Sequence, residues 1–479
     1  MSQEYILSID LGTTGCKVGV FDKDGGLKSL SYSEYPLYTN TSGWAEQDPI
    51  DWWNAVKQRM KSALLKANIP PSSIKAIGVT GQSTSVVFLG KKGTILRPAI
   101  LYMDARAEHY LPELFSKIKN MNYVEMKFYS NLIWLRDNDP NLYEKIEKVI
   151  DAKEFIAMKL TGRVTYDTFV LSPDRVKMIN ELLDIPDSFF GEPHDYKEPT
   201  GYLSEDISRE LGIPEGTPIV VGPWDGMCNV LGSGLTEDGI AMDVAGTTEI
   251  VAVSSKNKTD AASYRHLIEN LWLAYTSLPL AISYRWFRDK IAIHDTQYSM
   301  AAGMDAYNIL NLRASQSKAG AAGLLFIPTM QGDFMKPHLS GAFIGLRTTH
   351  TLNEMARAIM EGIAYHLRWM IERIEEGNVT VNEIRVSGGG AKSSLWNKIK
   401  ADVLNKPVKI LDVVETGCLG ATILTSTVIG WYSNLIEASQ AMIHIKETIT
   451  PEREQHEFYN KLYKKYREAF GFLDDFFSE

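Results

Sequence analysis

A short motif occurs twice in this 479-residue chain, once in each half, and it restricts what the chain can fold into. The copies are Ile9–Thr14 (IDLGTT) and Asp243–Thr248 (DVAGTT). Each follows an apolar run and leads into another β-prone run, which predicts a β-hairpin with Gly-Thr-Thr at its turn. Glycine permits a tight turn beside a ligand, and successive backbone N–H groups and threonine hydroxyls can bind phosphate oxygens. One such hairpin would fit an ordinary polar turn, but two predict duplicated domains with nucleotide phosphates between them.

Composition and cysteine spacing restrict the partners and the cellular location of the protein. Apolar residues make up 44% and charged residues 23%, as in globular proteins. The net charge of -9 argues against a nucleic-acid partner, although backbone amides and Mg²⁺ can still bind phosphate locally. Cys16, Cys228 and Cys418 lie too far apart in sequence to indicate disulfides or a metal site, which predicts a reducing, cytoplasmic location. No signal peptide or membrane-spanning stretch is expected, and Cys16 and Cys228 are interpreted as small buried residues.

The order of predicted elements indicates an α/β fold built from two domains. Strands and helices alternate in each half, with an antiparallel part in the sheet. The boundary is expected near Gly232–Leu235, which gives an N-terminal domain of residues 1–234 and a C-terminal domain of residues 235–479. In the second half, Thr351 opens a long helix through a capping box, and a predicted strand runs into Gly388–Gly390.

Neither a P-loop nor a dinucleotide-binding Gly-x-Gly-x-x-Gly motif is present. The paired hairpins instead resemble the actin, Hsp70 and hexokinase architecture, a ribonuclease H-like fold in which ATP lies in a cleft between duplicated domains. Five segments, in order, resemble the FGGY carbohydrate kinases: Asp10–Lys17, Gly43–Trp53, Arg97–Arg106, Gly341–Gly362 and Ser387–Ala391. The resemblance spans almost the whole chain and implies an ATP-dependent kinase whose acceptor is a hydroxyl of a sugar or polyol.

In that family, the acceptor hydroxyl is deprotonated by an aspartate in a Gly-x-x-Asp motif just before the second hairpin. Gly222–Asp225 (GPWD) occupies this place, so the resemblance implies that Asp225 is the catalytic base. A carboxylate at a strand end suits that role. The plainer interpretation is that Asp225 caps the following helix, and the two roles are compatible.

The resemblance also implies the nucleotide contacts. Asp10 would order Mg²⁺ through water together with Asp225. The expected phosphate loops are Gly12, Thr13, Thr14 and Lys17 in the first half and Gly246, Thr247 and Thr248 in the second. The expected adenosine pocket consists of Gly388, Gly389, Gly390, Gly417 and Gly420. A plain helix-entry loop is the other interpretation of the three successive glycines.

The expected sugar site departs from familiar members of the family. The segment Thr80–Thr84 (TGQST) carries Ser83 and Thr84 where xylulose kinases have Met-His and glycerol kinases have Arg-Glu. Small neutral hydroxyls suit a neutral polyhydroxylated substrate, D-xylulose or another ketopentose, better than gluconate or glycerol. A kinase for gluconate, ribulose, a deoxy-ketose or glycerol stays the alternative. The expected sugar contacts are Gln82, Ser83, Thr84, Tyr102, Asp104 and Trp224. Capping of the next helix is an equal alternative for Asp104.

A second function class stays open at this stage. An actin- or Hsp70-like ATPase, or a nucleotide-binding protein without turnover, would also carry the paired hairpins. Asp225 and the Ser387–Ala391 segment (SGGGA) favour the kinase. A homodimer is compatible with either class, and the sequence leaves the oligomeric state and regulation open.

Overall fold

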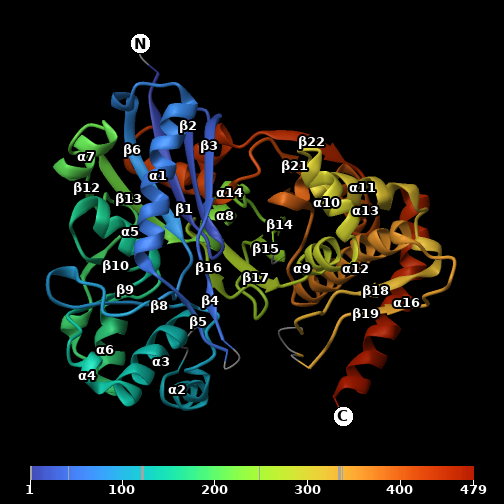
Figure 1. Ribbon diagram of the computed structural model, residues 1–479, viewed down its shortest axis with the longest axis horizontal. Helices are drawn as coiled ribbons and strands as arrows, with labels where there is room; N and C mark the ends of the chain where they lie inside the picture. Colours follow the sequence, from blue (N-terminus) through green and yellow to red (C-terminus); the bar gives the residue numbers. More distant parts are fainter. Residues whose placement is uncertain are drawn as a thin grey trace. The chain divides into compact units, whose positions relative to one another are not determined.

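The computed structural model describes residues 3–40, 43–119, 123–246, 249–332, 336 and 338–478 (Figure 1). The chain forms two compact units, and each is described by itself. Unit 1 comprises Met1–Gly232 and Thr416–Met442, and unit 2 comprises Ser233–Glu415 and Ile443–Glu479. The structure therefore places Thr416–Met442 in unit 1, whereas a division at residues 234 and 235 assigns this segment to the second domain.

Unit 1 is built on a six-stranded mixed sheet. In sheet order, its strands are β12 (Gly201–Tyr202), β13 (Pro218–Trp224), β6 (Ile74–Gly81), β1 (Tyr5–Leu11), β2 (Gly15–Asp22) and β3 (Leu27–Glu34). β13, β6 and β1 run parallel, and β12, β2 and β3 pair antiparallel to their neighbours. Side chains of β1 alternate between two covered faces, because Leu7 and Ile9 enter an apolar core while the Ser8 hydroxyl lies 2.7 Å from that of Thr422.

Helices cover both faces of this sheet. Those that pack on it are α1 (Pro49–Ala67), α5 (Ala152–Thr161), α8 (Asp225–Gly232) and α14 (Thr416–Val428). The other helices of unit 1 are α2 (Leu111–Lys117), α3 (Tyr123–Asn138), α4 (Pro140–Tyr143), α6 (Pro173–Leu183), α7 (Glu205–Leu211) and α15 (Leu435–Met442). Its short strands are β4 (Tyr38–Thr39), β5 (Ala45–Gln47), β7 (Val87–Leu89), β8 (Ala99–Ile100), β9 (Lys148–Ile150), β10 (Thr165–Asp167) and β11 (Glu192–His194).

Unit 2 repeats this topology. In sheet order, its strands are β16 (Tyr264–Arg265), β17 (Trp272–Leu278), β15 (Glu249–Ser255), β14 (Ile240–Ala245), β20 (Glu383–Ser387), β21 (Val408–Leu411) and β22 (Ile445–Ile449). β21, β20 and β14 run parallel, as β13, β6 and β1 do, and β15 and β17 follow antiparallel, as β2 and β3 do. The predicted α/β fold with two duplicated domains is confirmed.

A long helix crosses the core of unit 2. It is α12 (Leu352–Glu376), and the predicted capping box is present, since the Thr351 N–H donates to Glu354 Oε2 at 2.8 Å. The remaining elements are α9 (Ile282–Trp286), α10 (Ile293–Ala301), α11 (Ala306–Gln316), α13 (Ser394–Leu404), α16 (Arg453–Phe477), β18 (Leu325–Ile327) and β19 (Ala342–Ile344). Within the residues described, no helix combines the length and apolar character needed to cross a membrane.

Helices α8 and α14 approach each other so closely that their backbones touch at two glycines. A Cβ on Gly420 would overlap the Cys228 carbonyl oxygen, and one on Gly232 would overlap the Thr416 carbonyl oxygen. Sequence analysis places Gly420 in the adenosine pocket of the second domain. In the structure it lies in unit 1, and helix packing explains why it lacks a side chain.

The second hairpin is fixed by a buried ion triad. Lys400 Nζ on α13 lies 2.5 Å from Asp243 Oδ2 on β14 and 2.9 Å from Glu249 Oε1 on β15, and all three side chains are at most 1% exposed. Asp243 precedes its motif glycine by three residues, whereas Asp10 precedes Gly12 by two. Because side chains alternate along a strand, the two motif aspartates face opposite sides of their sheets.

The α8–α14 contact predicts that Gly420→Ala will be strongly destabilising. The added methyl group meets backbone, which cannot move aside, so we expect a loss of about 3 kcal/mol, the upper end of typical overpacking costs. Gly471 on α16 is the matched control, because a Cβ there meets nothing within 4 Å. Gly471→Ala should gain about 0.5–1 kcal/mol from helix propensity. Urea unfolding compares the variants, and equal stabilities would contradict the proposed packing.

The ion triad predicts a pH-dependent stability. Burial and the neighbouring Asp243 carboxylate raise the pKa of Glu249 from 4.5 to about 8, with Lys400 opposing the shift. Between these values the folded state binds more protons than the unfolded chain, so the free energy of unfolding falls as pH rises. We expect Glu249→Gln to remove a slope of at most about 1.4 kcal/mol per pH unit. Urea unfolding from about pH 5 to 8 measures it. Exposed Glu454→Gln is the control, and an unchanged slope in Glu249→Gln would refute the prediction.

Candidate active site

Three adjacent parallel strands of unit 1 end at one edge of the sheet. Leu11 on β1 pairs with Gly81 on β6, and Gly81 pairs with Trp224 on β13. The next residues, Gln82 and Asp225, are therefore neighbours although they are far apart in sequence. Ligands of α/β sheets bind outside the carboxyl ends of such strands. This edge is the candidate active site of unit 1.

Asp225 stands at this edge as the first residue of α8. Its Oδ1 accepts a hydrogen bond from the Gly226 N–H at 2.7 Å, while Oδ2 accepts none from the part of the chain that the structure describes. Burial raises the pKa of the Asp225 carboxyl. Burial also raises the pKa of the neighbouring Tyr102 phenol, and the Asp225 charge adds to that shift. Asp225 thus begins a helix, and one of its oxygens has no hydrogen-bond donor among the described residues.

The first motif forms the expected hairpin between β1 and β2. The Gly12 N–H donates to the Gly15 carbonyl at 3.1 Å, and the Gly12 carbonyl accepts from the Tyr35 hydroxyl. The Thr13 hydroxyl donates to the Tyr102 oxygen at 3.4 Å, which joins the hairpin to the Asp225 neighbourhood. Gly12 does not adopt a left-handed conformation, but a Cβ there would lie 3.3 Å from the Gly15 carbonyl oxygen, so the tightness of the turn itself favours glycine. Thr14 is exposed and Lys17 is half-buried.

Asp10, at the end of β1, faces the first turn of α14. A Cβ on Gly417 would overlap Asp10 Oδ2, so glycine lets this carboxylate sit against the helix. A helix N-terminus favours a negative charge. Gly417, like Gly420, is expected in the adenosine pocket of the second domain, but it lies in unit 1 beside Asp10.

The expected nucleotide residues of unit 2 gather at the end of β14. A Cβ on Gly388, whose φ is +75°, would lie 2.8 Å from the Ala245 carbonyl oxygen, and one on Gly390 would lie 2.5 Å from Ala245 Cβ. Packing against β14 therefore explains two of the three glycines, whereas a Cβ on Gly389 would make only an ordinary contact, 4.0 Å from the Ala245 carbonyl oxygen. Gly246 is exposed. Thr247 and Thr248 lie outside the described residues, so their phosphate role stays a prediction.

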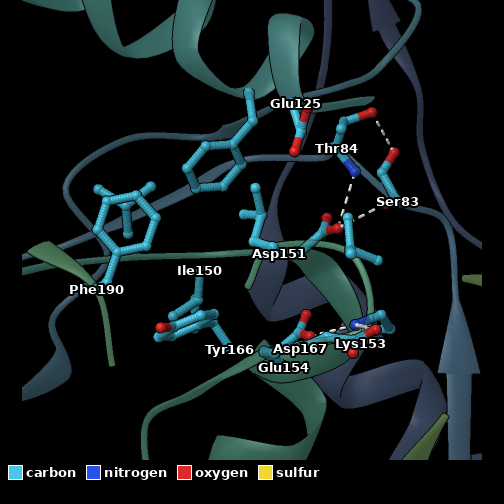
Figure 2. Close-up of a pocket in the computed structure, with 14 residues that line it drawn as sticks. Ser83, Thr84, Glu125, Ile150, Asp151, Lys153, Glu154, Tyr166, Asp167 and Phe190 are labelled. Atoms are coloured by element: carbon cyan, nitrogen blue, oxygen red, sulfur yellow. Dashed lines mark hydrogen bonds and ion pairs between the residues drawn. The ribbon is translucent and has the colours of Figure 1, made fainter. Parts of the chain in front are cut away.

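The residues that follow β6 make hydrogen bonds to other groups of the protein (Figure 2). The Ser83 hydroxyl donates to Asp151 Oδ2 at 3.1 Å, and the Thr84 hydroxyl donates to the Ser83 carbonyl at 2.6 Å. Gln82 Nε2 donates to Gln47 Oε1 at 3.2 Å, which leaves one of its two N–H donors for another partner. The contact with Asp151 was not identified from the sequence, although an aspartate just before the helix-forming run of residues 152–160 was an available signal.

Asp104, one of the expected sugar contacts, is bound within the protein. Its carboxylate is completely buried, pairs with Arg106 Nε at 2.8 Å and Nη2 at 2.7 Å, and accepts from the Ala45 N–H at 2.5 Å. Arg106 is in turn stacked on Trp44, with its guanidinium 3.9 Å from the ring centroid. Both Asp104 oxygens are occupied within the protein, which favours a structural role, and the sugar contact stays a prediction.

Aromatic rings border the same edge. Trp224 is half-buried and lies 6.1 Å from the Phe169 ring, and Tyr102 is also half-buried. Both are predicted sugar contacts. Phe169 was not identified from the sequence, where it is one of many aromatic residues.

Comparisons with known proteins cover both halves. The model of the N-terminal domain of the FGGY family of carbohydrate kinases matches residues 5–232, and that of the C-terminal domain matches residues 241–428. A xylulose kinase of Staphylococcus epidermidis is 28% identical over 97% of this chain and 96% of its own. A gluconokinase of Bacillus subtilis is 27% identical over 88% of this chain and 86% of its own.

A solved structure extends the similarity of fold. The xylulose kinase from Rhodospirillum rubrum superposes with a TM-score of 0.83, covering 99% of this chain and 100% of its own at 23% identity. The family match sets aside the actin- or Hsp70-like ATPase. Because matching family models span both halves, this chain belongs to the FGGY family of carbohydrate kinases, phosphotransferases that use ATP.

Proposed function

We propose that this kinase phosphorylates a neutral ketopentose such as D-xylulose and that Asp225 is the general base. The observation that carries the proposal is Asp225 Oδ2, which accepts no hydrogen bond from the described residues and stands at the shared edge of β6 and β13. A hydroxyl held there gives its proton to Oδ2 as its oxygen bonds to the γ-phosphorus of ATP, and the bond from that phosphorus to the β,γ-bridging oxygen breaks to release ADP. Burial raises the pKa of Asp225, which makes the carboxylate a stronger base than an exposed aspartate.

Nucleotide binding is proposed for the two motif loops. In unit 1, the turn at Gly12 offers backbone N–H groups and the Thr14 hydroxyl, and Lys17 supplies a positive charge. In unit 2, Gly246, Thr247 and Thr248 are proposed as the second phosphate loop, and the backbone of Gly388, Gly389 and Gly390 is proposed to support the adenosine. Asp10 and Asp225 suit Mg²⁺ bound through water, because this ion usually keeps several waters and takes only one or two carboxylates. When bound, Mg²⁺ offsets the negative charge of the phosphate oxygens.

The preference for a neutral sugar is supported by hydrogen-bond capacity. The Ser83 hydroxyl donates to Asp151, and the Thr84 hydroxyl donates to the Ser83 carbonyl. Toward a ligand, both hydroxyl oxygens can therefore only accept hydrogen bonds. A sugar hydroxyl can donate to them, whereas the carboxylate of gluconate has no proton to give. Asp225 adds negative charge at the same edge, which also disfavours a sugar acid. The relatives include both xylulose kinases and gluconokinases, so this choice is the one that requires testing.

The location is proposed to be a reducing compartment, the cytoplasm. All three cysteines are buried free thiols, and burial raises the pKa of Cys16 and of Cys228 to about 12. Protonated buried thiols behave as small apolar residues, which supports their interpretation as packing residues.

The base assignment predicts that Asp225→Asn will keep ATP and sugar affinity while turnover falls by roughly 10²–10⁴. Asparagine keeps the shape of the side chain but cannot take the proton. Steady-state ADP release measures turnover, and calorimetry measures both affinities. Exposed Asp174→Asn, in the first turn of α6, is the control. Wild-type turnover in Asp225→Asn would disprove the assignment.

The substrate proposal predicts strong stimulation of ADP release by D-xylulose or another ketopentose. Ribulose, a deoxy-ketose, gluconate and glycerol complete the panel, each compared with a reaction without sugar. Because sugar hydroxyls must donate to the acceptor-only oxygens of Ser83 and Thr84, we expect gluconate, whose carboxylate cannot donate, to rank below the ketopentose. Glycerol is expected to rank below it because Ser83 and Thr84 replace the Arg-Glu pair of glycerol kinases. Faster ADP release with gluconate or glycerol than with any ketopentose would reject the neutral-ketopentose preference. Equal ADP release with and without every sugar would reject the sugar-kinase proposal itself.

A further inference from the structure

Thr84 has an unusual backbone conformation at the candidate sugar site. Its φ is +61°, in the left-handed region, although it is a β-branched residue and only 4% exposed. Such residues rarely adopt this conformation, and they keep it only where the surrounding structure holds them. Backbone outliers of this kind concentrate at functional sites. The contacts that hold Thr84 therefore bear on sugar binding.

A single carboxylate makes most of those contacts (Figure 2). Asp151 Oδ2 accepts from the Thr84 N–H at 2.8 Å and from the Ser83 hydroxyl at 3.1 Å. Asp151 Oδ1 accepts from the Ser85 N–H at 2.9 Å and from the Ala152 N–H at 2.9 Å. Three of these four hydrogen bonds join α5 to the segment after β6, and the fourth caps α5 itself.

Few other groups near Asp151 can stabilise the negative charge of its carboxylate. It borders a cavity of about 40 Å³, enough for water, lined also by Lys153, Glu154 and Asp167. The ammonium of Lys153 is shared, since it pairs with Glu154 and lies 3.5 Å from Asp167 Oδ2. Burial raises the pKa of Asp151, and the Lys153 charge and the hydrogen bonds from Thr84, Ala152 and Ser83 oppose that shift. The carboxylate and the segment therefore stabilise each other, because a buried charge without donors is costly.

The same segment continues the active-site edge. Gln82 precedes it, and its N–H donates to the Leu11 carbonyl at 2.8 Å, beside the first phosphate loop. The Ser85 hydroxyl donates to Gln82 Oε1 at 3.1 Å, which orients the Gln82 amide. A shift of Ser85 would therefore move Gln82, and a shift of Thr84 would move the two hydroxyl oxygens proposed to face the sugar.

We propose that Asp151 is a positioning residue for sugar recognition: it holds residues 83–85, with Thr84 in the left-handed conformation, in the shape that receives the sugar. This inference rests on the proposed sugar-kinase function. It assigns to Asp151 an effect on sugar binding that acts through Ser83, Thr84 and Gln82, without contact to the reacting atoms.

The test replaces Asp151 by asparagine. Asparagine caps helices about as well as aspartate, so α5 stays capped, but its amide N–H groups face the Ser83 and Thr84 donors. We expect the KM for the sugar to rise about 10- to 100-fold, as for loss of hydrogen bonds to a charged group. The KM for ATP and kcat should stay within about threefold, because phosphate binding and proton transfer are untouched. A sugar KM equal to that of the wild type would overturn the proposal.

Asp48→Asn is the matched control. Asp48 caps α1 by accepting from the Ile50 N–H at 2.8 Å, so the variant makes the same charge change at a helix cap that does not contact the segment. We expect its sugar KM to be unchanged. An equal rise in both variants would show a general loss of structure and would overturn the positioning role.

A double-mutant cycle tests the link to Thr84. Glycine adopts positive φ readily, so Thr84→Gly removes the need to hold this residue in place. In the Thr84→Gly background, Asp151→Asn should raise the sugar KM by a smaller factor than it does in the wild type. Equal factors in both backgrounds would mean that Asp151 acts independently of Thr84, and would overturn the proposed route.

Hydrogen exchange separates this inference from the proposed function. In protein without ligands, the amides of Thr84 and Ser85 should exchange at least about tenfold faster in Asp151→Asn than in the wild type. Unchanged exchange would overturn the proposal whatever the substrate. If the wild type phosphorylates no sugar of the panel, the proposed function fails and the sugar-positioning role fails with it, while exchange still shows whether Asp151 holds the segment.

Discussion

The parallel pairing of β13, β6 and β1 is the constraint on which the candidate active site depends. It brings the ends of three strands to one edge, so that Asp225, Gln82 and Gly12 become neighbours across more than two hundred residues of sequence. Each of these residues follows a buried strand, and its place is fixed by backbone hydrogen bonds rather than by a flexible loop. Chemistry that requires several groups at set positions benefits from such a rigid support.

The two units show how one topology carries different chemistry. Both have the same order of parallel and antiparallel strands around a motif hairpin. In unit 1, the motif aspartate lies one residue before the end of its strand and faces α14. In unit 2, a shift by one residue turns Asp243 to the other side, where it shares the Lys400 ammonium with Glu249. A similar sequence motif therefore does not imply the same role for its acidic residue.

Local and periodic features were predictable from the sequence. The first hairpin, the capping box at Thr351 and the position of Asp225 at a strand end depend on residues close together in the chain. The packing role of Gly420 was not predictable, because the helix that requires a glycine there is distant in sequence. Arg106 lies two residues from Asp104, but the Ala45 N–H that also binds its carboxylate comes from a distant strand. Asp151 was missed for a related reason: its cap is visible locally, but its three contacts with residues 83–85 arise only on folding.

The return of Thr416–Met442 to unit 1 has a consequence for synthesis on the ribosome. Helix α14 covers one face of the β1, β6 and β13 region, yet it is translated after nearly all of unit 2. Domains usually fold in order from the N-terminus as they emerge. During synthesis, the sheet of unit 1 therefore lacks the helix α14 on one face until Thr416–Val428 has been translated. A nascent chain that stalls before α14 would leave this face of the sheet without its covering helix.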